Sequence, residues 1–399
     1  MNIVNITEKL SKSRDYLARH FKGARIDTFL IVAVIVVFVL IASSQFIRNI
    51  IQPRRTDISI SQSGETLFGT GTLAALVQEF EAQNPALRIQ ITAGSGADIV
   101  FFDDSTIGSL LAESTLASLK PYVHSETQTE QWAIPLVSFM DVFLYNIDIL
   151  QDAGSDRPPK TRADFLATAR AIAAEESAQP LALGLSPEDP LALRRELYPW
   201  IWAAGGELRQ ENGEGVTLSK AATDIIAFFD QLNREDLLAP GSFEKTRAQR
   251  LAEFAKGKIA MMVASSRDIP LLQRSAQNIN FSVTAIPQTV HSKNRLGLSE
   301  IYAGISSACA QPDEAWAFLA FLAGRKQALE EALNAVPGSH PSTYPGNYVE
   351  NNPLYSKVWD IFEAADIVEY YPAGPLEEET RSIIREKLEE VFEKEEKEN

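Results

Sequence analysis

Asp103, Asp104 and Ser105 directly follow the apolar run 99–102, which is short enough to form a buried strand. Open α/β sheets bind ligands beyond the carboxyl ends of their strands, where carboxylates and hydroxyls can hydrogen-bond a polar solute. Two adjacent carboxylates could also act as acid and base, but in this position they more often cap the next helix. We therefore favour capping, with hydrogen bonding to a ligand as a compatible second use.

Ser265, Ser266 and Arg267 form a second cluster of this kind. They follow the stretch 254–263, which ends an amphipathic segment, turns at Gly257 and becomes an apolar run. The pattern is typical of a strand that delivers polar residues to a ligand. A core strand followed by an ordinary helix cap is the alternative.

The length and the charge of the chain limit the functions that these two clusters can have. A chain of 399 residues is longer than one hydrophobic core usually supports, so two lobes or domains are expected. Residues 1–55 carry nine Lys/Arg and three Asp/Glu, whereas residues 56–399 carry 28 and 50. An acidic surface of this kind repels nucleic acid and anionic lipid headgroups, and it also favours solubility. We expect no nucleic-acid partner.

Catalytic and metal-binding motifs are missing from the sequence. Its single cysteine, Cys309, excludes an intrachain disulfide and a cysteine-cluster metal site, and the four histidines show no ligand spacing. There is no G-x-S-x-G or H-E-x-x-H motif, and the glycines near residue 70 match neither a dinucleotide loop nor a phosphate loop. We predict no enzyme activity, no catalytic residue, no metal and no cofactor.

Residues 28–47 are predicted to cross a membrane. They contain no charged side chain, and twenty residues at 1.5 Å each match a hydrocarbon core of roughly 30 Å. The alternatives are a buried core helix and a cleaved signal peptide, but the run exceeds the roughly 7–15 apolar residues of a signal peptide. Six cations lie in the basic arm 1–27, and Arg48, Arg54 and Arg55 follow the span. This asymmetry places the arm in the cytoplasm and the main domain outside, although Arg54 and Arg55 weaken it.

The spacing of apolar residues predicts the strands and helices that position the two clusters. Alternating runs at 57–63 and 88–92, a helix from about 73 to 84, the strand 99–102 and a helix ending near 119 give β-α-β-α order. This order is typical of a parallel sheet with helices on both faces. Thr161 with Asp164 approximates a capping box, and Gly205 and Gly206 close a helix. Single long helices are predicted for 311–333 and 376–395.

Several short motifs in a fixed order resemble the family 1 extracellular solute-binding proteins of ABC importers, the group that includes maltose-binding protein. The resemblance covers residues from about 56 to 399. The motifs that carry it are Phe80–Glu81 with Asn84–Pro85, the segment 97–100 (Ala-Asp-Ile-Val), Tyr145–Asn146, the block from Ala153–Gly154 to Phe165, Ala204–Gly205–Gly206, the stretch 254–262, and the helix 313–319.

The resemblance implies an α/β, two-lobe periplasmic-binding-protein-like fold (type II), with hinge strands and an N-terminal transmembrane helix added. It places residues 56–140 and 290–340 in the first lobe and residues 141–289 and 341–399 in the second. Such proteins most often bind sugars in the interlobe cleft and deliver them to ABC permease subunits. The uncleaved helix departs from most relatives, so a tethered sensor or accessory module for another, possibly anionic, solute is the alternative.

The same resemblance points to ligand-binding residues at strand ends that face the cleft. By this resemblance, Arg267 falls where sugar-binding relatives often carry an aromatic residue, and a cation there could pair with an anionic solute. Trp202 could stack on a sugar or fill the core. The full predicted set is Thr70, Gly71, Thr72, Asp103, Asp104, Ser105, Asp141, Tyr145, Trp202, Ser265, Ser266, Arg267, Glu300, Tyr302 and Tyr371.

Overall fold

The structure, a computed structural model, describes residues 55–62, 70–92, 94, 96–123, 131–189, 191–212, 215–275, 279–289, 293–333, 335–336, 347–371 and 378–392. Two compact units make up the chain, Met1–Thr56 and Asp57–Asn399. Within the described ranges, no helix is both long enough and apolar enough to cross a membrane. The basic arm 1–27 and the membrane helix predicted at 28–47 lie outside the described residues.

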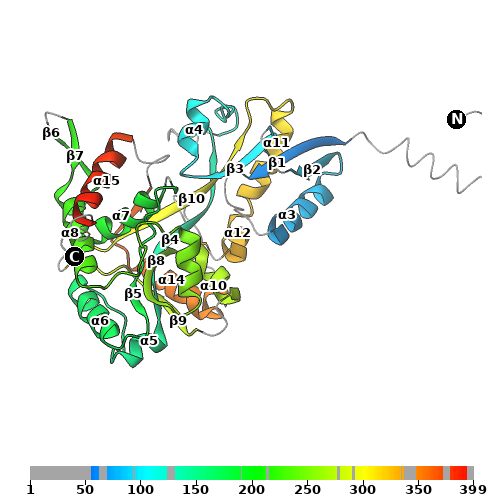
Figure 1. Cartoon of the computed structure of the whole chain (residues 1–399). Helices are drawn as coiled ribbons and strands as arrows, with labels where there is room; N and C mark the ends of the chain where they lie inside the picture. Colours follow the sequence, from blue (N-terminus) through cyan, green and yellow to red (C-terminus); the bar gives the residue numbers. More distant parts are fainter. Residues whose placement is uncertain are drawn as a thin grey trace, which may run out of the picture. The chain divides into compact units, whose positions relative to one another are not determined.

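A first lobe is built on one hydrophobic core that includes Ile60, Phe80, Phe101 and Phe318. Helices α3 and α11 pack against each other, and Phe80 meets Phe318 edge to face with ring centroids 5.0 Å apart (Figure 1). The elements of this lobe are β1 (Thr56–Gln62), α3 (Thr70–Gln83), β2 (Leu87–Ile91), β3 (Ile99–Asp103), α4 (Ile107–Ala112), α11 (Pro312–Ala323) and α12 (Lys326–Leu333).

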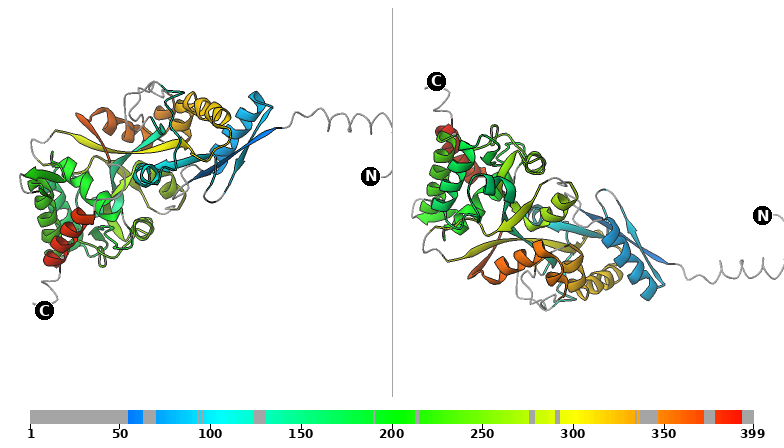
Figure 2. Two further views of the ribbon diagram at one scale, coloured as in Figure 1. Left: turned by 90° about the horizontal axis from the view of Figure 1, so that it is seen from above. Right: turned by 90° about the horizontal axis from the view of Figure 1, so that it is seen from below.

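A second lobe has two adjoining cores, one around Trp200 and one around Phe254. The C-terminal helix α15 lies against α8 in the views of Figures 1 and 2, and its Ile384 is fully buried. The elements are α5 (Ile147–Asp152), α6 (Arg162–Ala174), β5 (Gln179–Leu181), α7 (Ala192–Ala203), β6 (Arg209–Asn212), β7 (Gly215–Leu218), α8 (Lys220–Arg234), α9 (Arg247–Phe254), β8 (Ile259–Ser265), η1 (Ser266–Asp268), α10 (Ile269–Ser275), β9 (Phe281–Thr284), α13 (Asn347–Glu350), α14 (Pro353–Glu363), β11 (Ile367–Tyr370) and α15 (Glu378–Phe392).

Two long strands, β4 (Ile134–Asn146) and β10 (Arg295–Ile305), belong to both lobes. The main sheet runs β2-β1-β3-β10-β4-β8-β5, with β11 beside β10 and β9 beside β4. The amino-terminal part of β4 pairs with β10, and its carboxyl-terminal part pairs with β8 and β9. Because one strand packs into both cores, the polar residues near its middle lie where the lobes meet. The lobe boundaries predicted from the sequence remain a prediction.

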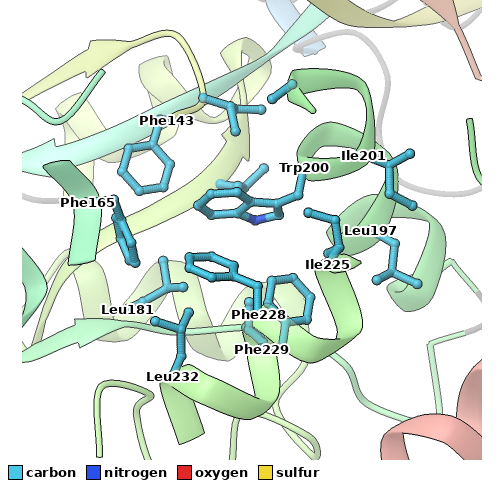
Figure 3. Close-up of a cluster of buried hydrophobic side chains, with 14 of the residues drawn as sticks. Phe143, Phe165, Leu181, Leu197, Trp200, Ile201, Ile225, Phe228, Phe229 and Leu232 are labelled. Carbon is cyan, nitrogen blue, oxygen red and sulfur yellow. The ribbon is translucent and has the colours of Figure 1, made fainter. Parts of the chain in front are cut away.

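An aromatic cluster forms the centre of the second lobe. Trp200 packs edge to face on Phe143 and Phe165, with ring centroids 5.8 Å apart in both pairs. Phe228 and Phe229 cover it from α8, as Figure 3 shows. Fully burying an aromatic side chain is worth roughly 1.5–3 kcal/mol, so this cluster supplies the rigid base on which α7 lies.

Several local predictions are confirmed. Thr161 accepts a hydrogen bond from the amide of Asp164, whose carboxylate accepts one from the amide of Thr161, which completes a capping box. Gly205, with φ +76°, makes the turn that ends α7, and Gly257, with φ +69°, makes the turn between α9 and β8. Glycine takes this left-handed conformation without the steric cost that a Cβ would bring.

Three predictions need correction. The helix expected to end near residue 119 stops at Ala112, because Ser114 adopts φ +56° and Leu116 bridges to Ser306 of the sheet. The helix expected over 311–333 is two helices, separated at Gly324, a residue with poor helix propensity. The sheet of the first lobe is mixed: β1 and β3 are parallel, as predicted, but β10 runs antiparallel to β3.

Candidate functional site

A cavity of about 80 Å³ lies where β3, β4 and β10 meet α7, α9 and β8. Eleven of the sixteen residues that line it are polar or charged, and they come from both lobes. The lining residues are Asp103, Asp104, Ser105, Phe139, Asp141, Leu191, Arg194, Arg195, Arg247, Arg250, Val263, Ala264, Ser265, Arg267, Ser299 and Ile301.

The first-lobe wall of the cavity is formed by residues at the end of β3. The Asp103 carboxylate accepts hydrogen bonds from the amide of Ser105, at 3.0 Å, and from its hydroxyl. Helix α4 begins after Thr106 and receives no side-chain cap. The predicted helix-capping role of Asp103 and Asp104 is therefore wrong: Asp103 closes a tight turn, and Asp104 points into the protein.

Asp104 forms an ion pair with Arg194 of α7, with 2.9 Å between Oδ1 and Nη2. The two side chains are only 9% and 4% exposed, so both charges are removed from water. The Ser299 hydroxyl lies 3.3 Å from the same oxygen, while Oδ2 has no hydrogen-bond partner among the described residues. Burial raises the pKa of Asp104 to about 6; Arg194 opposes this shift and the nearby Asp103 adds to it.

Asp141 of β4 accepts a hydrogen bond from the Tyr371 hydroxyl, at 2.8 Å. Burial is the main cause that raises the pKa of Asp141 to about 8; the Tyr371 hydrogen bond opposes the shift, and the charge of Asp104 adds to it. Gly297 leaves the room for this arrangement, because a Cβ there would lie 2.2 Å from Asp141 Oδ2 and 2.5 Å from the Trp202 ring. The Arg194 guanidinium lies over the Tyr371 ring, 4.5 Å from its centroid.

Arginines dominate the second-lobe wall of the cavity. Arg250 pairs with Glu196 at 2.6 Å, with both side chains below 5% exposure, and Arg247 pairs with Asp268. Arg195 lies 3.4 Å from Asp189 where both side chains are partly exposed. The Arg267 guanidinium is 5.9 Å from the centroid of the Phe139 ring.

Sequence reasoning missed four of these arginines because they lie on helices α7 and α9 and not at strand ends. Arg247 and Arg250 are three residues apart and share one face of α9. Leu251 and Phe254 of the same helix are buried, as is Arg250. A charge among the apolar positions of an amphipathic helix was the available signal.

Six of the predicted site residues line the cavity: Asp103, Asp104, Ser105, Asp141, Ser265 and Arg267. Three more support its wall from behind. Tyr371 hydrogen-bonds Asp141, Trp202 packs on Tyr371 with ring centroids 5.0 Å apart, and the Ser266 hydroxyl accepts a hydrogen bond from the amide of Met140. Ser265 also caps η1, as the alternative interpretation of its cluster predicted, and its contact with a ligand stays a prediction.

The other predicted residues are not among those that line the cavity. Gly71 and Thr72 lie in the first turn of α3, which begins at Thr70, and Tyr145 is buried in the core of the second lobe. Glu300 lies between the lining residues Ser299 and Ile301, so strand alternation directs it to the opposite face of the sheet. There Glu300 accepts hydrogen bonds from Ser138, at 3.2 Å, and from Tyr302, at 2.6 Å. Ligand contact stays a prediction for all the predicted residues that neither line nor support the cavity: Thr70, Gly71, Thr72, Tyr145, Glu300 and Tyr302.

Within the part of the chain that the structure describes, no group of three or more His, Cys, Asp or Glu side chains could hold a metal ion. The cavity instead offers carboxylates, hydroxyls and guanidinium groups. Carboxylates accept hydrogen bonds and guanidinium groups only donate them, so the lining suits a solute that presents both donors and acceptors.

The model of the family described as bacterial extracellular solute-binding protein matches residues 69–329. No curated protein sequence matches the chain. Maltose-bound T. maritima MalE3 has a TM-score of 0.67 and 16% identity, with 84% of this chain and 95% of that chain covered. The GacH receptor of Streptomyces glaucescens has a TM-score of 0.67 and 17% identity, covering 85% and 94%.

The ABC substrate-binding protein Lmo0181 from Listeria monocytogenes, in complex with cycloalternan, has a TM-score of 0.65 and 14% identity, with 84% of this chain and 94% of that chain covered. At such identities, structural similarity establishes the fold alone. The α/β, two-lobe architecture predicted from the sequence is thereby confirmed.

Replacing Arg194 by Leu should destabilise the protein by about 3–5 kcal/mol, because Asp104 would be left as a buried charge without its partner. Urea unfolding of the full-length chain in mild detergent would measure the loss. The matched control is Arg170→Leu, which removes an arginine from an exposed pair with Glu235 and should cost less than about 1 kcal/mol. Adding Asp104→Asn to Arg194→Leu should recover most of the stability. Equal losses of unfolding free energy in Arg194→Leu and Arg170→Leu would show that the buried ion pair matters no more to stability than the exposed one.

Stability should fall as the pH rises from about 6 to about 8, because folded Asp141, whose pKa is raised to about 8, keeps a proton that the unfolded chain has already lost. The slope for one proton is at most about 1.4 kcal/mol per pH unit. Asp141→Asn should flatten the curve in this interval, and Tyr371→Phe should extend the decline to higher pH by removing the donor that favours the charged form. Urea unfolding at a series of pH values would test this. An unchanged slope in Asp141→Asn would refute the assignment.

Proposed function

The chain belongs to the bacterial extracellular solute-binding protein family, as its motifs predicted, and from this premise we propose that it is the membrane-anchored solute receptor of an ABC importer. Proteins of this family bind solutes and are not enzymes. The observation that carries the proposal is the cavity to which β3, β4, α7, α9 and β8 contribute hydrogen-bonding side chains from both lobes. A solute that fills it would bridge the lobes and favour their closed arrangement.

We propose a carbohydrate as the solute. Among proteins with this fold, T. maritima MalE3 is bound to maltose, Lmo0181 to cycloalternan, and the GacH receptor to acarbose. Asp103, Asp104 and Ser105 on one wall and Ser265 on the other can hydrogen-bond hydroxyl groups. Charge-assisted hydrogen bonds of this type are roughly twice as strong as neutral ones.

We further propose that residues 28–47 remain as a membrane anchor, with residues 1–27 in the cytoplasm and the solute-binding lobes outside. The support is the uncharged twenty-residue run and the greater number of cations before it than after it. An anchored receptor would stay beside its permease, and its local concentration there would be set by the tether.

A soluble ligand should raise the thermal unfolding temperature of the full-length chain, because a solute at about 100 times its dissociation constant stabilises the folded state by about 2.7 kcal/mol. A panel of glucose, maltose, sugar acids and hydroxy acids would be screened by differential scanning fluorimetry. Asp103→Asn should weaken binding of the best ligand by about tenfold or more. Asp156→Asn, an exposed change outside the cavity, is the matched control. If no member of the panel shifts the transition, the carbohydrate proposal fails.

Alkaline carbonate washing should leave the full-length chain in the membrane pellet, since removing electrostatic contacts does not extract a spanning helix. Deleting residues 28–47 should release it. Protease added to spheroplasts should digest the lobes and spare a tag on the amino terminus. Protection of the lobes would contradict the proposed orientation, and repeated purification without any permease subunit would favour a tethered sensor or accessory module.

A further inference from the structure

We propose that closure of the two lobes depends on pH, because closure removes the carboxyl groups of Asp104 and Asp141 from water at the floor of the cavity. Acid favours the closed arrangement, and alkali favours the open one. This inference rests on the hinge closure of the receptor proposed above. It does not depend on which solute the receptor binds, and its experiment uses none.

The cavity lies where the two shared strands pass from one hydrophobic core to another. Along β4, Phe139 packs in the first-lobe core and Met140 in the second-lobe core around Phe254. Along β10, Leu298 belongs to that second-lobe core and Ile301 to the first-lobe core. Each core moves with its own lobe, so a hinge rotation would bend both strands at these positions. The surroundings of the polar side chains on the cavity floor therefore change when the lobes close.

Asp104 is buried by a contact between the lobes. Its amide donates a hydrogen bond to the carbonyl of Glu300 within the first-lobe sheet, at 3.2 Å. Its carboxylate meets Arg194 of α7 in the second lobe, and Asp104 as a whole is only 6% exposed. Its Oδ2 has no hydrogen-bond partner among the described residues. Parting of the lobes would separate the ion pair and return the carboxylate to water, so its charge is costly only in the closed arrangement.

Asp141 lies on the same floor, on strand β4. It lines the cavity and accepts the hydrogen bond of the Tyr371 hydroxyl at 2.8 Å. The space around its Oδ2 is filled, since even a Cβ at Gly297 would lie 2.2 Å away. Opening of the lobes would widen the cavity and let water reach this carboxyl group. Two carboxyl groups from different strands thus lose water together when the lobes close.

Burial outweighs the favourable contacts of both groups. It raises the pKa of Asp104 to about 6, with Arg194 opposing and Asp103 adding to the shift. It raises the pKa of Asp141 to about 8, with Tyr371 and Arg194 opposing and the charges of Asp104 and Glu196 adding. The phenols of Tyr302 and Tyr371 also face Asp104, and burial raises the pKa of both. The other charged groups that line the cavity are Arg195, Arg247, Arg250 and Arg267, which stay protonated in both arrangements.

The direction of the pH effect follows from linkage. An aspartate in water has a pKa of about 4, so closure raises the pKa of both carboxyl groups and takes up protons. Lowering the pH therefore shifts the equilibrium toward the closed arrangement. Between about pH 8 and pH 6, Asp141 is the one of the two that contributes, and below about pH 6 both do. Each proton changes the ratio of closed to open molecules by at most about tenfold per pH unit.

Double electron–electron resonance on the full-length chain in mild detergent would measure the distance between spin labels on the two lobes. The labels would be placed at Glu113→Cys and Asp156→Cys, both exposed, after Cys309→Ser removes the single native cysteine. We expect the population at the distance of this structure to grow at least about tenfold, relative to more open molecules, as the pH falls from 8 to 5.

Variants test which groups are responsible. Asp104→Asn combined with Asp141→Asn should stay closed and lose the pH response, because neither position can then carry a charge. Arg194→Leu should shift the protein toward the open arrangement at pH 7, since the charge of Asp104 loses its partner on closure. Asp152→Asn, an exposed change on α5 outside the cavity, is the matched control and should respond to pH as the parent does. A thermal unfolding scan would verify that each variant folds.

The parent alone can overturn the inference, through a distance distribution that stays constant from pH 5 to pH 8. A double variant that keeps the parent's response would overturn it too. If the double variant does not fold, Asp104→Asn by itself decides, since it should lose the part of the response below about pH 6 and keep the rest. A sugar panel without any binding would remove the carbohydrate assignment and leave this inference standing.

Discussion

The ion pair between Asp104 and Arg194 joins the end of β3 to α7 across the cavity, with both side chains almost inaccessible to water. Removing two charges from water costs several kcal/mol for each ion, so such a pair adds little net stability. Its effect is geometric, because neither charge can be left unpaired. Two neighbouring groups contact this pair directly: the Ser299 hydroxyl lies 3.3 Å from the same oxygen of Asp104, and the Tyr371 ring lies under the guanidinium of Arg194.

The polar cluster continues directly into the hydrophobic core of the second lobe. Tyr371 hydrogen-bonds Asp141 on one side and packs on Trp202 and Tyr198 on the other, with ring centroids 5.0 and 5.8 Å away. Gly297 of β10 leaves the room for this contact, since a Cβ there would collide with both Asp141 and Trp202. The strands shared by the lobes, the charged cavity and the core are therefore one packed assembly. A solute that binds in the cavity would therefore contact ion-paired side chains whose positions are already fixed by the packing of the core.

Local structure was largely predictable because it depends on near neighbours in the chain. The Thr161–Asp164 capping box and the turn at Gly257 follow from residues at most three positions apart. The apolar run that follows this turn became the buried strand β8 for the same reason. The errors arose where distant contacts intervene: a bridge from Leu116 to Ser306 ends the segment after α4, and β10 enters the first-lobe sheet from nearly 200 residues later in the chain.

For the candidate site, the sequence by itself determined the family motifs and the residues at the ends of β3 and β8, because a strand's carboxyl end can be located from its apolar run. Asp104 and Arg267 were found in this way, and both line the cavity. Only the tertiary structure decided that Arg194 and Arg250 belong there too, since a charge on a helix reads as solvent-exposed until a buried carboxylate is placed opposite. It also decided the face on which Glu300 lies, because strand alternation becomes specific only when the register between strands is known. The burial of Trp202 on α7 was decided by tertiary packing as well, since Tyr371 and Gly297 cover it from distant parts of the chain.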